Sequence, residues 1–577
     1  MKLGILLPAA STALALLELE HTEQKVLSVG KEEKGDMRKP PFDSDFEAFA
    51  KAVLDRWKVP GVSVAVVDGE DIWAEGYGIA SFPSTPATPS TLYYTGSTTK
   101  AFTAAILSLL IASGDFPSSE EPSSSSPLSW QTPISHIIRD DFVLGPGYEW
   151  ATAHLTLEDA LSHRTGFPRH DKALARKYGP DRSSPATVRD VVRSLRYLPV
   201  VAEPRVVWRY CNLMYMVATH VIQTLTGKGL GDVMRERIWG PLGMEATYLS
   251  VEEALDAGRE VARGYYWDYQ GEADGHGKGQ GFISVPYGSL DLASGAGGIV
   301  SNVLDYARWI RCLIRGDGSD DDNENGCPVL PKEAHRELKL ARIAMPPEMG
   351  INFDAPLAYA LGWELSTYKG WRIFTHSGGM EAYGAEVYFL PDLKYGVVTL
   401  GNTAVTSNLV GTELAWKLID DKLGVPEEER FDWISRGEEA LNTRLKLAET
   451  AVHELYPERA DPPLPQALPL EKYVGVYSHP AYQNITLQLT DEDSTKNTKG
   501  ELGALRDDME WQMTFDFHHV SGEFWAVVID MLNTPNLLNG QRARAQFELG
   551  VKGTVDKLKM EFLEDGSEGV IVFDRVV

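Results

Sequence analysis

Apolar residues near the start of the chain recur with two different periods, first that of a helix and then that of strands. The helical spacing of three and four is kept by Phe46, Phe49, Val53, Leu54 and Trp57. The apolar run 61–67 follows and predicts a buried strand, and Asp68-Gly69 is typical of a turn into a second strand at 72–78. The pattern therefore predicts a helix that leads into a β-hairpin.

A second cluster of strands is predicted much further along the chain. It comprises residues 372–375, 384–390 and 395–400, and a helix over 408–423 follows it. The residues between the two strand clusters favour helices. Because strands at both ends of a helical segment can join in one sheet, we expect an α+β domain, placed at 43–428, whose antiparallel sheet unites its two ends.

The last part of the chain has a different composition. Residues 429–466 change from a polar helical pattern to a proline-rich stretch, which is typical of a linker between domains. Short alternating runs follow, at 474–477, 485–489, 524–529 and 570–573. They predict a small antiparallel β-barrel or sandwich, and we assign residues 467–577 to a lipocalin-like barrel.

The N-terminus has the pattern of a secretory signal. One lysine precedes a short apolar run within residues 1–17, and Ala13-x-Ala15 would serve as a cleavage site. Residues 18–42 are polar and predict a flexible leader. A short N-terminal helix in a cytoplasmic protein is the alternative. The sequon at Asn484 fits a glycosylated secreted protein.

Three cysteines leave the pairing open. Cys312 and Cys327 flank an acidic loop and could close it as a disulfide in an oxidising compartment, which would leave Cys211 unpaired.

The charge of the chain excludes some classes of partner. Its formal net charge is −27, whereas nucleic-acid binding requires clustered basic residues. No segment after the N-terminus approaches the length of a membrane span. We therefore expect neither a nucleic-acid nor a membrane partner, and a small-molecule or peptide substrate is the expected ligand.

A serine and a lysine three residues apart are the first candidate for chemistry. Ser97 and Lys100 begin a stretch of good helix formers that ends at Gly114. Residues three apart on a helix share a face, so the Lys100 amine can reach the Ser97 hydroxyl and take its proton. The same spacing occurs at Ser366 and Lys369 outside a helical setting, so the motif alone has low specificity.

Two further clusters give the motif its context. Tyr210-Cys-Asn212 precedes an apolar helical run, and His376-Ser-Gly-Gly379 ends a predicted strand. The order Ser-x-x-Lys, Tyr-x-Asn and Lys/His-x-Gly resembles the class C branch of the serine β-lactamase and penicillin-binding-protein superfamily, which includes esterases, D-aminopeptidases and transesterases. Supporting stretches lie at 161–170, 241–247 and 295–301. The resemblance covers about residues 45–425.

The resemblance implies a role for each residue of the motifs. Ser97 would be the nucleophile that forms an acyl-enzyme, with Lys100 and Tyr210 as the acid/base pair. Asn212 would hydrogen-bond Lys100 or the acyl amide of the substrate. The backbone N–H groups of Ser97 and Gly379 would form the oxyanion hole. The remaining members of the edge-strand motif, which would bind substrate, are His376, Ser377 and Gly378.

Position 376 departs from the β-lactamases of this branch, which carry a lysine there. A histidine titrates near pH ~6.5 and is mostly neutral at pH 7. We therefore expect poor recognition of a substrate carboxylate, weak or absent β-lactamase activity, and an ester, an amide or a D-amino-acid peptide as substrate.

The resulting hypothesis is a serine hydrolase with no cofactor and no metal. An acyltransferase or transesterase in small-molecule biosynthesis is the first alternative, because the same acyl-enzyme serves both reactions. A catalytically silent binding protein on the same fold is the second. The barrel is expected either to assist a homo-oligomer or cover the active-site mouth, or to be a passive stabilising module.

Overall fold

A computed structural model of the chain describes residues 39–119, 126–178, 183–268, 281–316, 326–490, 502–534 and 540–576. They form two compact units. The sheet unit comprises residues 39–130 and 222–439, and the barrel unit comprises residues 131–221 and 440–576. The predicted signal peptide at 1–17, and the predicted leader as far as residue 38, lie outside the described residues.

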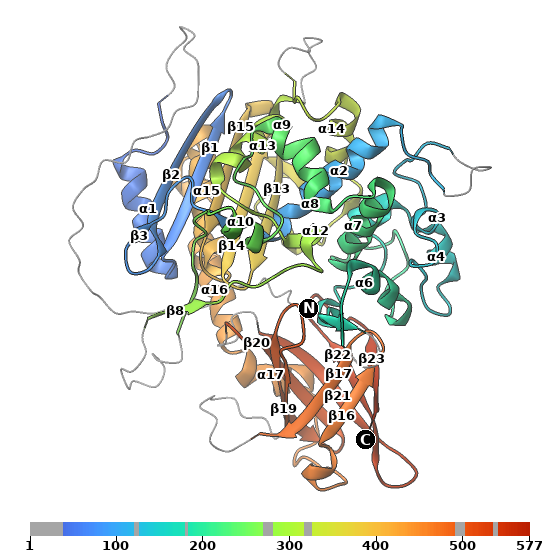
Figure 1. Cartoon of the computed structure of the whole chain (residues 1–577). Coiled ribbons are helices and arrows are strands. Elements are labelled where there is room, and N and C mark those ends of the chain that lie inside the picture. The colour runs from blue at the N-terminus through green and yellow to red at the C-terminus, as the bar shows by residue number, and fades with distance from the viewer. Residues whose placement is uncertain are drawn as a thin grey trace. The chain divides into compact units, whose positions relative to one another are not determined.

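Nine strands of the described chain form one antiparallel sheet in the sheet unit (Figure 1). In spatial order they are β10 (Ile343–Ala344), β11 (Ala358–Tyr359), β12 (Glu364–Tyr368), β13 (Trp371–Met380), β14 (Tyr383–Leu390), β15 (Tyr395–Gly401), β1 (Gly61–Asp68), β2 (Asp71–Ser81) and β3 (Thr85–Pro86). β1 pairs with both β2 and β15. The expected sheet that unites the two ends of the domain is thereby confirmed.

Helices cover both faces of this sheet (Figure 1). The helices of the unit are α1 (Ser44–Trp57), α2 (Thr99–Ser113), α8 (Leu230–Met234), α9 (Gly240–Leu242), α10 (Val251–Asp256), α12 (Ser294–Gly297), α13 (Val303–Arg315), α14 (Lys332–Lys339) and α15 (Thr406–Leu423). A Cβ placed at Gly411 of α15 would lie 2.3 Å from Thr399, and one at Gly396 would lie 2.6 Å from Ile310 of α13. Residues 396 and 399 point to opposite faces of β15, so α15 and α13 lie on opposite faces of the sheet.

The apolar helix α2 lies among the helices on the α13 side. Its Phe102 stacks on Trp309 of α13 with ring centroids 4.6 Å apart, and α2 also contacts α12 and α14. The predicted stop is confirmed, because Gly114 caps the helix at φ 69°. Contrary to the sequence expectation, one segment of the described residues, Gly96–Ser113, is long and apolar enough to cross a membrane by length and composition; 78% of it is buried inside the protein.

The barrel unit contains a closed barrel of eight strands in the part of the chain that is described (Figure 1). They are β16 (Gly475–His479), β17 (Gln483–Leu489), β18 (Leu502–Arg506), β19 (Met513–Ser521), β20 (Phe524–Met531), β21 (Gln541–Leu549), β22 (Val555–Phe562) and β23 (Val570–Arg575). Buried aromatic side chains such as Phe517, Trp525 and Phe547 fill its interior. The predicted antiparallel barrel is confirmed.

The barrel shares its unit with a helical segment from the middle of the chain. The elements of that segment include α3 (Ile134–Ile137), α4 (Glu149–His154), α5 (Leu157–Leu161), β5 (Lys177–Tyr178), β6 (Ser184–Pro185) and α6 (Val188–Ser194). The Arg176 N–H donates to Asp508 O at 2.9 Å, and the Glu510 N–H donates to Leu174 O at 2.8 Å. Backbone hydrogen bonds therefore join the two parts of the unit.

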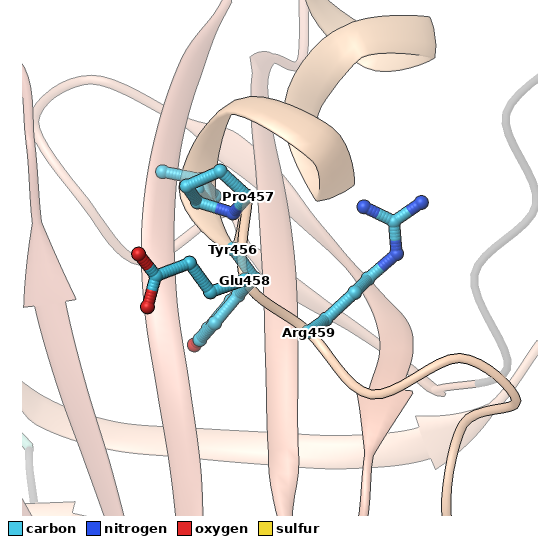
Figure 2. A pocket seen from close by; sticks show the side chains of 5 residues that line it. Tyr456, Pro457, Glu458 and Arg459 are labelled. Carbon is cyan, nitrogen blue, oxygen red and sulfur yellow. The ribbon is translucent and has the colours of Figure 1, made fainter.

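Three further helices lie at or near the borders of the units. α7 (Leu213–Thr226) and α16 (Trp433–Leu445) each contain residues of both units, and α17 (Leu447–Leu455) packs on β20 of the barrel. A shallow hollow at the end of α17 is lined by Leu455, Tyr456, Pro457, Glu458 and Arg459 (Figure 2). None of these is a predicted site residue, so the hollow is not the candidate active site.

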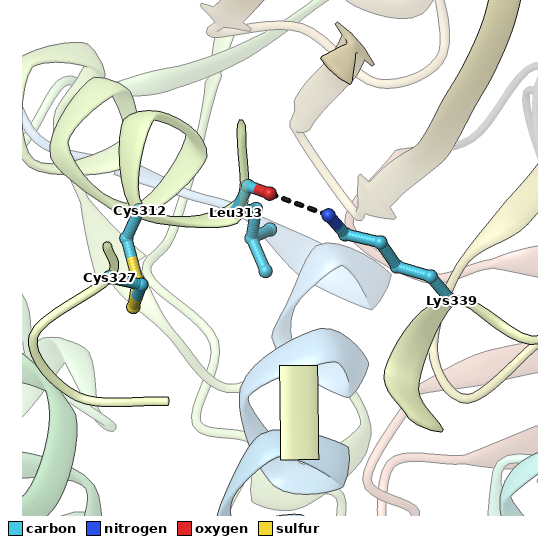
Figure 3. Close-up of a disulfide and its surroundings, with 4 residues drawn as sticks. All are labelled: Cys312, Leu313, Cys327 and Lys339. Carbon is cyan, nitrogen blue, oxygen red and sulfur yellow. Dashed lines mark hydrogen bonds between the residues drawn. A yellow bond between two sulfur atoms is a disulfide. The ribbon is translucent and has the colours of Figure 1, made fainter. Parts of the chain in front are cut away.

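A disulfide joins Cys312 of α13 to Cys327 (Figure 3). This is the pairing that the sequence left open, and the acidic loop between the two cysteines lies outside the described residues. Cys211 is free and fully buried, and burial raises the pKa of its thiol to about 12. Its thiol is therefore protonated at neutral pH.

Candidate active site

Ser97 lies where the chain passes from a short strand into α2. The single turn η1 (Gly96–Thr98) carries it, directly before the first residue of the helix. Gly96 has φ 52°, and a Cβ there would lie 2.6 Å from the backbone nitrogen of Gly379. The turn can approach strand β13 this closely because position 96 has no side chain.

Lys100 points back to this serine from the first turn of α2. Its Nζ donates to Ser97 Oγ at 3.0 Å and to Ala296 O of α12 at 2.8 Å. The lysine side chain is fully buried. The predicted serine–lysine hydrogen bond is present, and the arrangement can transfer a proton between the two side chains.

His376 of β13 is buried beside this pair. Its Nε2 lies 3.0 Å from the hydroxyl of Tyr359 on β11, and its Nδ1 lies 2.6 Å from Ser377 O. Burial lowers the pKa of His376 to about 3, with a smaller contribution from the Lys100 charge. The imidazole is therefore neutral at physiological pH and offers no cation to a substrate.

The rest of the edge-strand motif alternates along β13. Gly378 is buried, and a Cβ there would lie 2.0 Å from Thr95 O in the segment that carries Ser97. Ser377 and Gly379 are exposed, and a Cβ at Gly379 would meet no atom of the described chain within 4 Å. The pairing of β13 with β12 ends at Thr375, whereas its pairing with β14 continues to Met380. Beyond Thr375, and without bulk at Gly379, β13 can therefore accept the backbone of a substrate alongside it.

Tyr210 and Asn212 belong to the barrel unit. The ring of Tyr210 lies 4.3 Å from that of His163 and 4.9 Å below the guanidinium carbon of Arg169, measured to the ring centroid. Asn212 Nδ2 donates to both carboxylate oxygens of Asp171, at 3.1 and 3.0 Å. These contacts hold the motif between a cation and a carboxylate.

His163 has a structural role in this motif. Its Nδ1 accepts the backbone N–H of Cys211 at 3.1 Å, and His163 itself has φ 58°. The histidine thus fixes the loop between the two candidate residues.

Sequence reasoning missed several of these partners. No local signal pointed to Ala296 O or to Tyr359, because each belongs to an element distant in sequence from the residue that it contacts. Arg169 lies within the supporting stretch 161–170, and Asp171 directly follows it.

The second Ser-x-x-Lys sequence has different contacts in the structure. Ser366 lies on β12 and donates to Ala355 O, while Lys369, at φ 48°, pairs with Glu429. These side chains do not form a serine–lysine pair. Asn484 lies on β17 opposite Ser478, and its glycosylation stays a prediction. Among the described residues no group of three His, Cys, Asp or Glu side chains could hold a metal ion.

Comparison with known proteins gives the class of the protein. The beta-lactamase family profile matches residues 46–418, and a domain of unknown function, DUF3471, matches residues 459–572. The chain belongs to the beta-lactamase family, within the serine β-lactamase and penicillin-binding-protein superfamily. It is a hydrolase of that fold.

Curated relatives extend over most of the chain. It is 41% identical over 524 residues to unguisins hydrolase ungD' of Aspergillus campestris, covering 91% of this chain and 89% of the relative. It is 40% identical over 513 residues to unguisins hydrolase ungD of Aspergillus violaceofuscus, covering 87% and 86%. A D-aminopeptidase of Brucella anthropi is 26% identical over 394 residues, covering 67% and 64%.

Solved structures share the fold at lower identity. An octameric penicillin-binding protein homologue from Pyrococcus abyssi is 20% identical with a TM-score of 0.52, and the match covers 92% of this chain and 99% of that one. A D-amino acid amidase from Ochrobactrum anthropi is 23% identical with a TM-score of 0.50, covering 66% and 100%.

Proposed function

We propose that this protein is a serine hydrolase that opens an amide bond through an acyl-enzyme on Ser97. The observation that carries the proposal is the 3.0 Å hydrogen bond from the buried Lys100 Nζ to Ser97 Oγ. Geometry of this kind is what an activated serine requires. The turn that carries Ser97 lies against Gly378 and Gly379 of β13, and this position supports the same reaction.

In the proposed reaction Ser97 Oγ forms a bond to the carbonyl carbon of the substrate. The proton of the Ser97 hydroxyl passes at the same time to the acid/base pair of Lys100 and Tyr210. The backbone N–H groups of Ser97 and Gly379 stabilise the oxyanion. The tetrahedral intermediate then collapses: the C–N bond breaks, and the acid/base pair passes the serine proton to the leaving amine, which leaves the acyl group as an ester on Ser97. Water then attacks the ester and gives up a proton through the same residues, which restores the Ser97 hydroxyl and releases the acid.

The hydrogen bonds of Asn212 favour one of its two expected roles. Since its Nδ2 donates to Asp171, its carbonyl oxygen remains as the acceptor. We infer that Asn212 acts in the reaction as a hydrogen-bond acceptor rather than as a donor to the acyl amide of the substrate.

Two observations indicate the class of substrate: the neutral charge of His376 and the activities named for the curated relatives. A neutral imidazole provides no cation for a carboxylate, so a penicillin is a poor substrate. The relatives at 41% and 40% identity are hydrolases of unguisins, and more distant ones are D-aminopeptidases. We therefore propose unguisins as the first substrates and D-amino-acid amides as the second, with water as the acceptor.

Intact-mass spectrometry after brief exposure to an activated acyl ester tests the acyl-enzyme. The wild-type protein should gain the mass of one acyl group, and Ser97→Ala should gain none. Ser366→Ala is the matched control, because it removes the serine of the second Ser-x-x-Lys sequence and should keep the adduct. An equal adduct on Ser97→Ala would refute the proposal. Unguisins, D-amino-acid amides and a penicillin are then compared by kcat/KM.

Secretion remains a proposal of its own. It is supported by the N-terminal signal pattern, the Cys312–Cys327 disulfide and the sequon at Asn484. Expression of the whole chain in a secreting host should place a glycosylated, N-terminally processed protein in the medium. Retention of the unprocessed chain inside the cells would contradict it.

A further inference from the structure

A cluster of charged side chains lies between the segment 169–172 and the loop 564–568 of the barrel, within one unit. Arg169 Nε lies 3.0 Å from Glu564 Oε1, and its NH1 lies 3.2 Å from Asp565 Oδ2. Lys172 Nζ lies 3.0 Å from Glu564 and 3.2 Å from Glu568. Buried charges are costly unless they are paired, so this loop must be in place for the cluster to be stable.

The cluster extends to the Tyr-x-Asn motif. Arg169 lies over the ring of Tyr210 at 4.9 Å, and its Nε also lies 3.0 Å from the Asp171 carboxylate that accepts from Asn212. One guanidinium thus connects a barrel carboxylate, Glu564, to both candidate residues of the motif.

The electrostatics of the cluster agree with this arrangement. Burial alone would lower the pKa of Arg169, but Glu564, Asp171 and Asp565, and then Tyr210, raise it well above its ordinary value. Burial alone would raise the pKa of Glu564, but Arg169 and Lys172 lower it to about 2. Arg169 and Glu564 are therefore both charged throughout the physiological range.

We propose that Arg169 is a positioning residue for Tyr210 and that Glu564 of the barrel holds Arg169 in place. The inference rests on the proposed function, in which Tyr210 is an acid/base group. A cation close to a phenol favours the phenolate, which is the form that accepts a proton. The barrel then acts on the reaction through the charge that it holds over Tyr210.

Two other ring contacts of Tyr210 within the described part of the same unit, His163 and Trp208, do not supply this charge. His163 lies 4.3 Å away, but its Nδ1 accepts the Cys211 N–H and is therefore unprotonated, and Trp208 at 5.9 Å carries no charge. In the proposed reaction Lys100 shares the acid/base role with Tyr210. Arg169 is itself surrounded by Asp171, Glu564 and Asp565, which reduce its effect without cancelling it.

The first test is the pH dependence of kcat/KM for an activated acyl ester. Arg169→Met removes the charge, so the acidic limb should move to higher pH by about one to two units, with about a tenfold or greater loss below neutral pH. Arg169→Lys keeps a charge and should retain most of the wild-type profile. A merely structural role would lower Tm and leave the profile of Arg169→Met in place, which would overturn the proposal.

The second test asks whether Glu564 acts through Arg169. Glu564→Gln should lower kcat/KM, and the double variant with Arg169→Met should be no less active than Arg169→Met alone. Glu568→Gln is the matched control, since it removes a buried carboxylate of the same loop whose hydrogen bonds go to Lys172 and Tyr482. It should lower Tm without changing the profile.

The outcomes separate the two proposals. If the wild-type protein forms no Ser97-dependent adduct, the proposed function is refuted. If the adduct forms but the effects of Glu564→Gln and Arg169→Met on kcat/KM are additive, only the inference about Arg169 is refuted. If Arg169→Met does not fold, Glu564→Gln against Glu568→Gln decides: equal activity in the two overturns the inference.

Discussion

Replacing Lys100 by methionine tests the centre of the proposed site. The substitution keeps an unbranched apolar stem and removes the amine that lies 3.0 Å from Ser97 Oγ. General acid/base groups contribute roughly 10²- to 10⁴-fold to a rate. This corresponds to about 3–5 kcal/mol of activation free energy. We expect acylation of Ser97 to slow by that factor.

Folding should survive the same change. The hydrogen bond from Lys100 to Ala296 O is lost, at about 1.5–3 kcal/mol for a charged donor. Removing an amine from a fully buried position avoids its desolvation, which offsets much of that loss. We therefore expect Tm to change by only a few degrees.

The assay is rapid-mixing acylation by an activated ester, with intact mass as the readout. Lys339→Met is the matched control, because Lys339 is also buried and donates to a backbone carbonyl, Leu313 O, at 2.6 Å (Figure 3). It should acylate like the wild type. Acylation of Lys100→Met within tenfold of the wild-type rate would refute a role for the amine. An equal fall in the acylation rate of Lys339→Met would refute it as well.

Four further outcomes are expected. An amide or activated ester should be hydrolysed faster than a penicillin by orders of magnitude, and comparable kcat/KM values would contradict the reading of His376. His376→Lys should speed acylation by penicillin about tenfold or more by supplying a cation, and an unchanged rate would show that the position does not meet the carboxylate. Burial lowers the pKa of His170 to about 4, so the unfolded chain binds a proton near pH ~6.5 while the folded chain does not. His170 should thus cost up to about 3 kcal/mol of stability as the pH falls from ~6.5 to ~4, and His170→Asn should flatten the decline of Tm in that window. Thiol titration of the denatured, unreduced protein should find Cys211 alone, and reactive Cys312 or Cys327 would contradict the disulfide.

Local signals in the sequence were enough to predict many of the elements and the order of the motifs. Spacing of apolar residues placed α1, β1 and β2 within a few residues of their observed bounds, and the helical setting of Ser97 and Lys100 followed from the same pattern. These features depend on residues close in sequence, since periodicity and turn chemistry are local signals. For the same reason the serine–lysine contact could be predicted: one turn of helix brings the two side chains together.

The environment of these residues depends on contacts between segments that are distant in sequence. The partner of His376 comes from β11, and the second partner of Lys100 comes from α12. The proline-rich composition at 429–466 suggested a boundary there, yet residues 131–221 form a compact unit with the barrel. Hydrogen bonds such as Glu510 N–H to Leu174 O join segments that no local pattern relates. A charge pair such as Arg169 and Glu564 forms because packing brings the two side chains together, and contact between distant segments leaves no periodic trace in the sequence.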